Sequence, residues 1–212
     1  MNPQEETANT WNKIASVYQE RFMDLAIYNH TYDEFCNAIT STHPRILEIG
    51  CGPGNITKYL LSQLPNMFLH GIDIAPNMID LAKKNNPNAS FSIMDCREIH
   101  QLTDTYDGIM CGFCFPYLSK EEAIQLIENA AAILNSNGLL YISTMEDDYN
   151  KSGVQTSSNG EDKIFMYYHQ EDYLKATLLQ NNFTILDTKH QSFPTQDGST
   201  VTDMIIIGRL KS

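Results

Sequence analysis

The chain is short of positive charge and of long apolar runs. Its 212 residues include 14 Lys and Arg against 26 Asp and Glu, a formal net charge of −12. Because phosphate backbones bind clustered basic side chains, this balance disfavours nucleic acid as a partner. No stretch approaches the roughly 18 apolar residues that a membrane span needs, so we expect no membrane segment.

The chain also lacks the features of exported and metal-binding proteins. Its first ten residues, MNPQEETANT, have neither the basic region nor the apolar core of a secretory signal. The five cysteines are odd in number and scattered, which is typical of reduced thiols rather than of a disulfide framework. No cluster of His, Cys and Asp has metal-ligand spacing. We therefore expect a cytoplasmic protein without a metal.

What the chain does contain is enough apolar sequence for one α/β domain, with 42% hydrophobic residues. Short apolar runs that predict strands alternate with periodic stretches that predict helices. The predicted strands cover 45–50, 68–74, 90–95, 106–113, 139–144 and 163–169. The predicted helices cover 28–39, 55–63, 75–85, 120–134 and 171–180. This alternation predicts a mostly parallel sheet with helices on both faces.

The two ends of the chain and one internal stretch depart from this alternation. Apolar residues three and four apart from Trp11 to Leu25 predict an amphipathic helix within a helical segment at 1–42. Residues 146–161 are polar and rich in Gly, Ser and Asn, which predicts a mobile loop. Two β-type runs, 183–193 and 201–210, predict an antiparallel hairpin at the sheet edge, around a turn at 194–199.

A glycine-rich turn follows the first predicted strand, in the run Glu48-Ile49-Gly50-Cys51-Gly52-Pro53-Gly54. Glycines let a ligand touch bare backbone there, and open α/β sheets bind ligands outside the carboxyl ends of their strands. A dinucleotide loop reads G-x-G-x-x-G. Here Gly50, Gly52 and Gly54 are each two residues apart, which disfavours a nicotinamide-dependent oxidoreductase. A tight turn without a ligand is the structural alternative.

The run from Glu48 to Gly54 resembles the E-x-G-x-G-x-G signature of class I (Rossmann-like) methyltransferases. The resemblance covers roughly 11–210 and is strongest over 46–144. It implies a Rossmann-like, seven-stranded and mostly parallel sheet that ends in the antiparallel hairpin. It further implies S-adenosylmethionine as the cofactor and methyl transfer to a small molecule. The whole chain, 1–212, would be one methyltransferase domain, with 1–42 as a helical lid and 145–170 as an insertion near the substrate pocket.

The resemblance also implies which residues contact the cofactor. Asp73, a little over twenty residues after the glycine turn, matches the acid that accepts both ribose hydroxyls; its alternative role is to cap the following helix. Ile74 and Met78 would flank the adenine or ribose. Tyr18 would lie near the methyl group, where its ring attracts the sulfonium. The other implied contacts are Glu48, Gly50, Cys51, Gly52, Asp95, Cys96 and Cys111.

The residues that act on the acceptor are less closely defined. His169, Tyr117 and Glu146 are candidate bases for an acceptor that must lose a proton. Cys111 and Cys114 form a C-x-x-C, but no second pair completes a zinc site, so we expect two unpaired thiols lining the pocket. The run Cys114-Phe115-Pro116-Tyr117 is a distant echo of the N-P-P-Y motif of amino-group methyltransferases, with Cys114 in place of the essential Asn or Asp.

The sequence leaves the acceptor, the methylated element and the oligomeric state open. The favoured hypothesis is an enzyme that methylates a small molecule. The alternative is a catalytically silent domain that binds S-adenosylmethionine and regulates or scaffolds other proteins.

Overall fold

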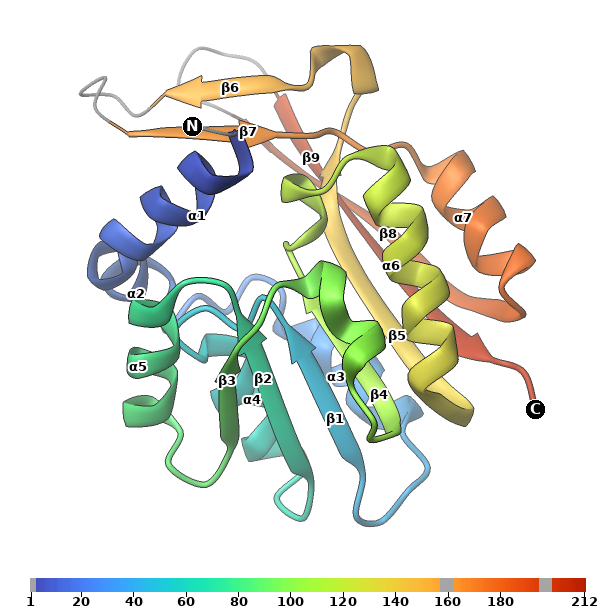
Figure 1. The fold of residues 1–212 in the computed structure, drawn as a ribbon. Helices are drawn as coiled ribbons and strands as arrows, with labels where there is room; N and C mark the ends of the chain where they lie inside the picture. Colours follow the sequence, from blue (N-terminus) through green and yellow to red (C-terminus); the bar gives the residue numbers. More distant parts are fainter. Residues whose placement is uncertain (1–2, 157–161, 195–199) are drawn as a thin grey trace.

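A seven-stranded sheet runs through the centre of the computed structural model, which describes residues 3–156, 162–194 and 200–212 (Figure 1). Its strand order is β3-β2-β1-β4-β5-β9-β8. The strands are β1 (Arg45–Ile49), β2 (Phe68–Asp73), β3 (Ser90–Ile93), β4 (Tyr106–Gly112), β5 (Leu134–Glu146), β8 (Phe183–Pro194) and β9 (Thr200–Leu210). The first five are parallel, and β9 pairs antiparallel with both β5 and β8. The predicted fold, with its antiparallel C-terminal pair, is confirmed; most of the predicted turn at 194–199 lies outside the described residues.

Helices cover both faces of the sheet because neighbouring strand residues point to opposite sides. On β1, Ile46 belongs to a buried cluster that also includes residues of α3 (Asn29–Ala38), α4 (Asn55–Gln63) and α5 (Pro76–Asn85). The next residue, Leu47, belongs to a second buried cluster, with residues of α6 (Lys120–Ile133) and α7 (Glu171–Gln180), on the other face. Both side chains are fully buried. A strand buried on both faces has a continuous apolar sequence, and β1 was predicted from such a run.

The start of α6 is set by a capping box between Ser119 and Glu122. The Ser119 Oγ accepts from the Glu122 N–H at 3.2 Å, and the Glu122 carboxylate accepts from the Ser119 N–H at 2.7 Å. At its other end α6 stops at Ile133, and β5 begins directly at Leu134, which pairs with Tyr106 ahead of an irregularity in the ladder. Within the first part of β5, Asn137 has a left-handed backbone with a φ of 65°.

A second, two-stranded sheet replaces part of the predicted mobile loop. A 3-10 turn, η3 (Tyr149–Lys151), leads into β6 (Gly153–Thr156), which pairs antiparallel with β7 (Lys163–Met166). The loop prediction is therefore wrong for 149–156, while 157–161 lie outside the described residues. The sequence did not predict β6 because most of its residues are exposed. Such a strand lacks the alternation of apolar and polar residues from which strands are predicted.

The first helical segment is divided into α1 (Pro3–Lys13) and α2 (Ala15–Phe22), with a change of backbone direction at Ile14 (φ −95°, ψ 12°). The Thr10 hydroxyl donates to the Lys163 carbonyl at 2.9 Å, and Thr7 Oγ1 accepts from the Phe165 N–H at 3.0 Å. These bonds hold α1 beside β7, across the carboxyl ends of the central strands (Figure 1). Among the residues described, no helix is both long and apolar enough to cross a membrane.

Candidate active site

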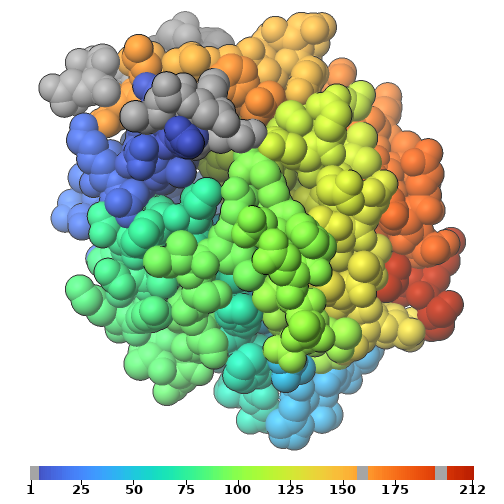
Figure 2. All heavy atoms as spheres, in the orientation of Figure 1, coloured from blue at the N-terminus to red at the C-terminus, as the bar shows by residue number. Residues whose placement is uncertain are grey.

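A cavity opens at the carboxyl ends of β1, β2, β3 and β4, under the roof that α1 and β7 form. The β1–β4 boundary is where the strand order reverses, the position at which open α/β sheets bind ligands. Figure 2 shows α1 and the β6–β7 pair along the upper part of the molecule, above α5. The space between the lining atoms, open mouth included, is about 1030 Å³.

The turn after β1 forms the floor of the cavity and needs glycine for its backbone. Gly50, Gly52 and Gly54 have φ of 66°, 52° and 82°, the left-handed region that side chains with a Cβ rarely adopt. A Cβ at Gly52 would lie 3.7 Å from Cε1 of Tyr18, which covers the turn from α2. Gly50 and Gly52 border the cavity, so bare backbone faces any ligand bound there.

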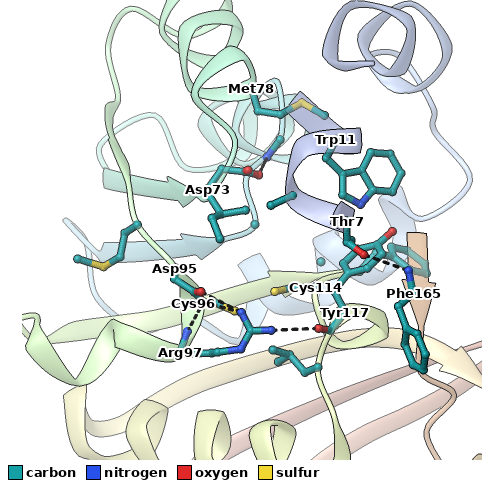
Figure 3. A pocket seen from close by; sticks show the side chains of 18 of the residues that line it. Thr7, Trp11, Asp73, Met78, Asp95, Cys96, Arg97, Cys114, Tyr117 and Phe165 are labelled. Carbon is teal, nitrogen blue, oxygen red and sulfur yellow. Dashed lines mark hydrogen bonds and ion pairs between the residues drawn. The ribbon is translucent and has the colours of Figure 1, made fainter. Parts of the chain in front are cut away.

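Asp73 ends β2 and turns its carboxylate toward the glycine turn and the cavity (Figure 3). One carboxylate oxygen accepts from the Gly52 N–H and the other from the Ala75 N–H, both at 2.9 Å. Burial raises the pKa of Asp73, and these backbone donors oppose the shift. A carboxylate offers about four acceptor positions, so Asp73 keeps acceptor capacity for a ligand hydroxyl.

A polar network closes the cavity beyond β3. The Arg97 guanidinium donates to both oxygens of Asp95 at 2.9 and 3.0 Å, and its Nε donates to Glu122 at 2.6 Å. Its remaining nitrogen reaches the Tyr117 carbonyl at 3.4 Å (Figure 3). Asp95 also accepts from the Arg97 N–H at 2.9 Å. The single cationic side chain among the described lining residues is thus shared between two carboxylates.

Aromatic rings form the wall opposite Asp73. Trp11 from α1 meets Tyr117 edge-on at 5.6 Å between ring centroids and Tyr18 at 5.5 Å. Phe165 and Tyr167, from β7 and the segment after it, add two rings 4.7 Å apart. The Trp11 indole N–H is buried with no hydrogen-bond partner among the described residues. Because buried donors in proteins are usually paired, this N–H is left to bond an acceptor atom of a ligand or of a water molecule.

Most of the residues predicted to contact the cofactor do line the cavity. The structure brings together Tyr18, Gly50, Gly52, Asp73, Ile74, Met78, Asp95 and Cys96, along with Tyr117 from the predicted acceptor site. Cys51 and Cys111 lie just behind the lining and are almost fully buried. Of the C-x-x-C pair, only Cys114 reaches the cavity. Burial and a thiol neighbour raise the pKa of Cys96 and of Cys114 well above the usual value.

Glu48 lies beneath the glycine turn rather than on the cavity surface, with 1% of its surface exposed. One carboxylate oxygen accepts from the Thr57 hydroxyl, and the other has no partner among the described residues. Burial raises the pKa of Glu48 to about 8, although the Thr57 bond opposes the shift. Its predicted contact with the cofactor stays a prediction.

His169 does not reach the cavity. It is fully buried, and its Nε2 lies 2.8 Å from the Phe115 carbonyl, so that nitrogen carries the proton and donates. Its Nδ1 accepts from the Tyr173 hydroxyl. Burial lowers the pKa of His169 to about 4. With both nitrogens occupied away from the ligand space, His169 has the surroundings of a structural residue, which argues against its predicted role as a base.

Glu146, the third candidate base, also lies outside the cavity lining. Its carboxylate is 2.9 Å from His190 Nε2, and Glu171 is 3.2 Å from the same nitrogen. Among the described residues these three side chains form a group whose ligand atoms lie within 4.8 Å of one another. Lys175 pairs with Glu171 as well, so contacts within the protein already hold these side chains.

Several lining residues were not singled out from the sequence. They are Thr7, Ala8, Met94, Arg97, Leu118, Phe165 and Tyr167. Phe165 and Tyr167 are two apart in the predicted strand 163–169, and that spacing alone would have placed them on one face. Arg97 had no local signal, because its partner Glu122 is 25 residues away in the chain.

The fold and this cavity define a Rossmann-like domain whose acidic strand end and bare glycine turn suit a ribose-containing ligand. Residues 46–138 match the family model described as a methyltransferase domain. A malonyl-[acyl-carrier protein] O-methyltransferase of Anoxybacillus flavithermus is 35% identical over 142 residues, which cover 61% of this chain and 52% of that protein. This chain therefore spans about half the length of the curated relatives it matches.

Solved structures share the fold along almost the whole chain. Magnesium protoporphyrin IX methyltransferase from Synechocystis, solved with bound S-adenosylmethionine, superimposes with a TM-score of 0.72 and 16% identity and covers 100% of this chain and 98% of its own. A methyltransferase from Methanosarcina mazei gives a TM-score of 0.70 at 18% identity, covering 82% and 96%. The resemblance to class I S-adenosylmethionine-dependent methyltransferases that the sequence predicted is thus confirmed by the family model, by the relatives and by the shared fold.

Proposed function

We propose that the chain binds S-adenosylmethionine in this cavity and transfers the methyl group to a small molecule held against the aromatic wall. The observation that carries the proposal is the position of Asp73, whose carboxylate borders the cavity while anchored to the glycine turn. When bound, the cofactor supplies a methyl group that its sulfonium makes electrophilic. Every other contribution comes from how the chain positions the two reactants.

The lining residues divide this work among them. Asp73 holds the ribose hydroxyls, and the backbone of Gly50 and Gly52 lies beside the amino-acid tail. Ile74 and Met78 bracket the adenine, and the Tyr18 ring faces the sulfonium, where cation–π attraction contributes about 0.5–2 kcal/mol. Holding the acceptor in line behind the methyl group replaces a bimolecular encounter, which lowers the barrier by about 7–11 kcal/mol in favourable cases.

The roof of the cavity excludes water. We assign this role to α1 and α2 within 1–42 and to the β6–β7 pair within 145–170, with 1–212 acting as one domain. The bonds from Thr7 to Phe165 and from Thr10 to Lys163 join these two segments, so they move together when the cavity opens.

All five cysteines are free in the structure, which supports a cytoplasmic location.

Two measurements test the proposal. Calorimetric titration with S-adenosylhomocysteine should show binding at one site, and titration with NAD should show none. Labelled methyl from S-adenosylmethionine should then pass into a component of a metabolite extract. Tight NAD binding without S-adenosylhomocysteine binding would overturn the proposal. Cofactor binding without any methyl transfer would favour the alternative of a silent binding domain. Some relatives are named as malonyl-[acyl-carrier protein] O-methyltransferases, so a carboxylate on a carrier protein should be among the acceptors tested.

A further inference from the structure

The acceptor side of the cavity is aromatic and carries no available positive charge in the part of the chain that the structure describes. Its rings are Trp11, Tyr117, Phe165 and Tyr167, and its charged lining residues are Asp73, Asp95 and Arg97. Arg97 is held by Asp95 and Glu122 at 2.6–3.0 Å. An acceptor carboxylate or phosphate would enter without a partner cation, and burying an unpaired anion is costly.

The same lining offers no side chain suited to remove a proton. Asp95 is paired with Arg97, and Asp73 is committed to the backbone and, in the proposed function, to the ribose. Burial raises the pKa of the Tyr117 phenol, and the thiols of Cys96 and Cys114 have pKa values well above their usual range. His169 lies outside the lining with both nitrogens bonded. An acceptor here must already present a lone pair at neutral pH.

Charge and shape together select one chemical class. A ring nitrogen of an uncharged heteroaromatic molecule has a free lone pair, stacks on aromatic side chains and becomes a cation when it is methylated. Aromatic faces and a net negative lining both attract that cation. A phenol or an ammonium would need a base, and a carboxylate would need a free cation.

We propose that the methyl acceptor is the uncharged ring nitrogen of a small heteroaromatic molecule, which leaves as an N-methyl cation. This inference rests on the proposed methyl-transfer function. In the step, the nitrogen lone pair forms the new N–C bond while the methyl–sulfur bond breaks and its electron pair returns to sulfur. The positive charge passes from sulfur to nitrogen, and no proton moves.

Trp11 is the one tryptophan in the chain and lines the cavity, so its fluorescence reports binding directly. Protein saturated with S-adenosylhomocysteine is titrated with three bicyclic probes of similar size, which are uncharged quinoline, cationic N-methylquinolinium and anionic 1-naphthoate. Quinoline and N-methylquinolinium should bind at least about tenfold more tightly than 1-naphthoate. Equal or tighter binding of 1-naphthoate, or no binding of the two nitrogen compounds, would overturn the acceptor class.

Turnover gives a second and independent readout. Labelled methyl from S-adenosylmethionine should appear on quinoline at a rate that is flat from about pH 7 to pH 9, because no base has to ionise. A rate that climbs roughly tenfold per pH unit, or transfer to malonyl-coenzyme A but not to quinoline, contradicts the inference. If S-adenosylhomocysteine itself gives neither heat nor a fluorescence change, the proposed function has failed instead, so the two failures are distinguishable.

Variants of the aromatic wall localise the effect. Tyr117→Leu and, separately, Tyr167→Leu should weaken N-methylquinolinium binding by about 3- to 30-fold while S-adenosylhomocysteine affinity stays within about threefold. Both tyrosines are only partly buried, and the second variant guards against misfolding of the first. Phe68→Leu is the matched control, because Phe68 is 49% exposed at the start of β2, away from the cavity. If both variants bind the cation as the wild type does, the aromatic wall does not recognise it.

Discussion

The carboxylate of Asp73 accepts a hydrogen bond from the N–H of Gly52 at 2.9 Å, so the end of β2 holds the turn after β1 in place. One side chain therefore both shapes the turn and borders the cavity. This coupling explains why the acid and the glycines, 21 residues apart, belong to a single site.

Replacing Asp73 should weaken cofactor binding strongly. Asp73→Ala removes the proposed acceptor of two ribose hydroxyls, and hydrogen bonds to charged groups contribute about 1.5–3 kcal/mol. We expect the affinity for S-adenosylhomocysteine, measured by calorimetry, to fall between about 10- and 150-fold. Asp24→Ala is the control, because Asp24 is exposed and bonded only to Lys58 in the structure described. Unchanged affinity in Asp73→Ala would remove the main support for the proposed site.

A side chain at Gly54 should destabilise the fold rather than block the ligand. A Cβ there would lie 2.3 Å from Nδ2 of Asn86, and φ is 82°. Such strain costs on the order of 1–3 kcal/mol, so urea unfolding of Gly54→Ala should show that loss of stability. Gly153→Ala is the comparison, since no atom lies within 4 Å of the added Cβ. Equal midpoints for the two variants would show that the turn relaxes freely.

Glu48 should make stability fall as the pH rises. Its folded-state pKa is raised to about 8 from an ordinary 4.5, so the folded protein keeps the proton that the unfolded chain releases. The resulting stabilisation is complete below about pH 4.5 and is lost as the pH rises toward 8. Between pH 4.5 and 7 this loss is about 3 kcal/mol.

The isosteric variant Glu48→Gln should therefore lose this slope and gain stability over the wild type near neutral pH. Unfolding by urea at several pH values checks it. Glu20→Gln, at an exposed position on α2, should keep the wild-type slope. Parallel curves for Glu48→Gln and the wild type would mean that Glu48 is ionised in the folded protein.

His169 should produce the opposite pH dependence. Its folded-state pKa is lowered to about 4 from 6.5, so the unfolded chain takes up the proton first as the solution is acidified. Stability is therefore lost as the pH falls from about 6.5 to 4, by about 3 kcal/mol in all. His169→Gln should remove this dependence and cost about 1–3 kcal/mol at pH 7 through imperfect bonding to Phe115 and Tyr173.

Measuring turnover tests whether His169 has a structural role alone. The pH profile of turnover in the folded His169→Gln protein should match that of the wild type, because the ring does not reach the cavity. A selective loss of the acidic limb of the profile, where the rate rises as a base loses its proton, with stability unchanged, would restore His169 as the base.

The local sequence pattern was sufficient to predict the parts of the cavity lining that lie at the ends of successive strands. The glycines at 50, 52 and 54, the acid at 73 and the pair at 95–96 each come where a predicted strand ends, and parallel strands bring those ends to one edge of the sheet. Prediction failed for β6, whose exposed polar residues give no periodic signal. Nothing in the sequence indicated that the ring of His169 is turned toward Phe115, outside the described cavity lining.

By itself, the sequence determined the order of strands and helices, the glycine turn and the acid that faces this turn, because periodicity, glycine spacing and strand ends are local properties. Only the tertiary structure decided which aromatic rings meet across the cavity, that Arg97 is held by Asp95 and Glu122, and that α1 is bonded to β7. Those contacts join residues as far as 158 positions apart. Such pairings depend on how the elements pack, and packing leaves no mark on the spacing of either partner alone.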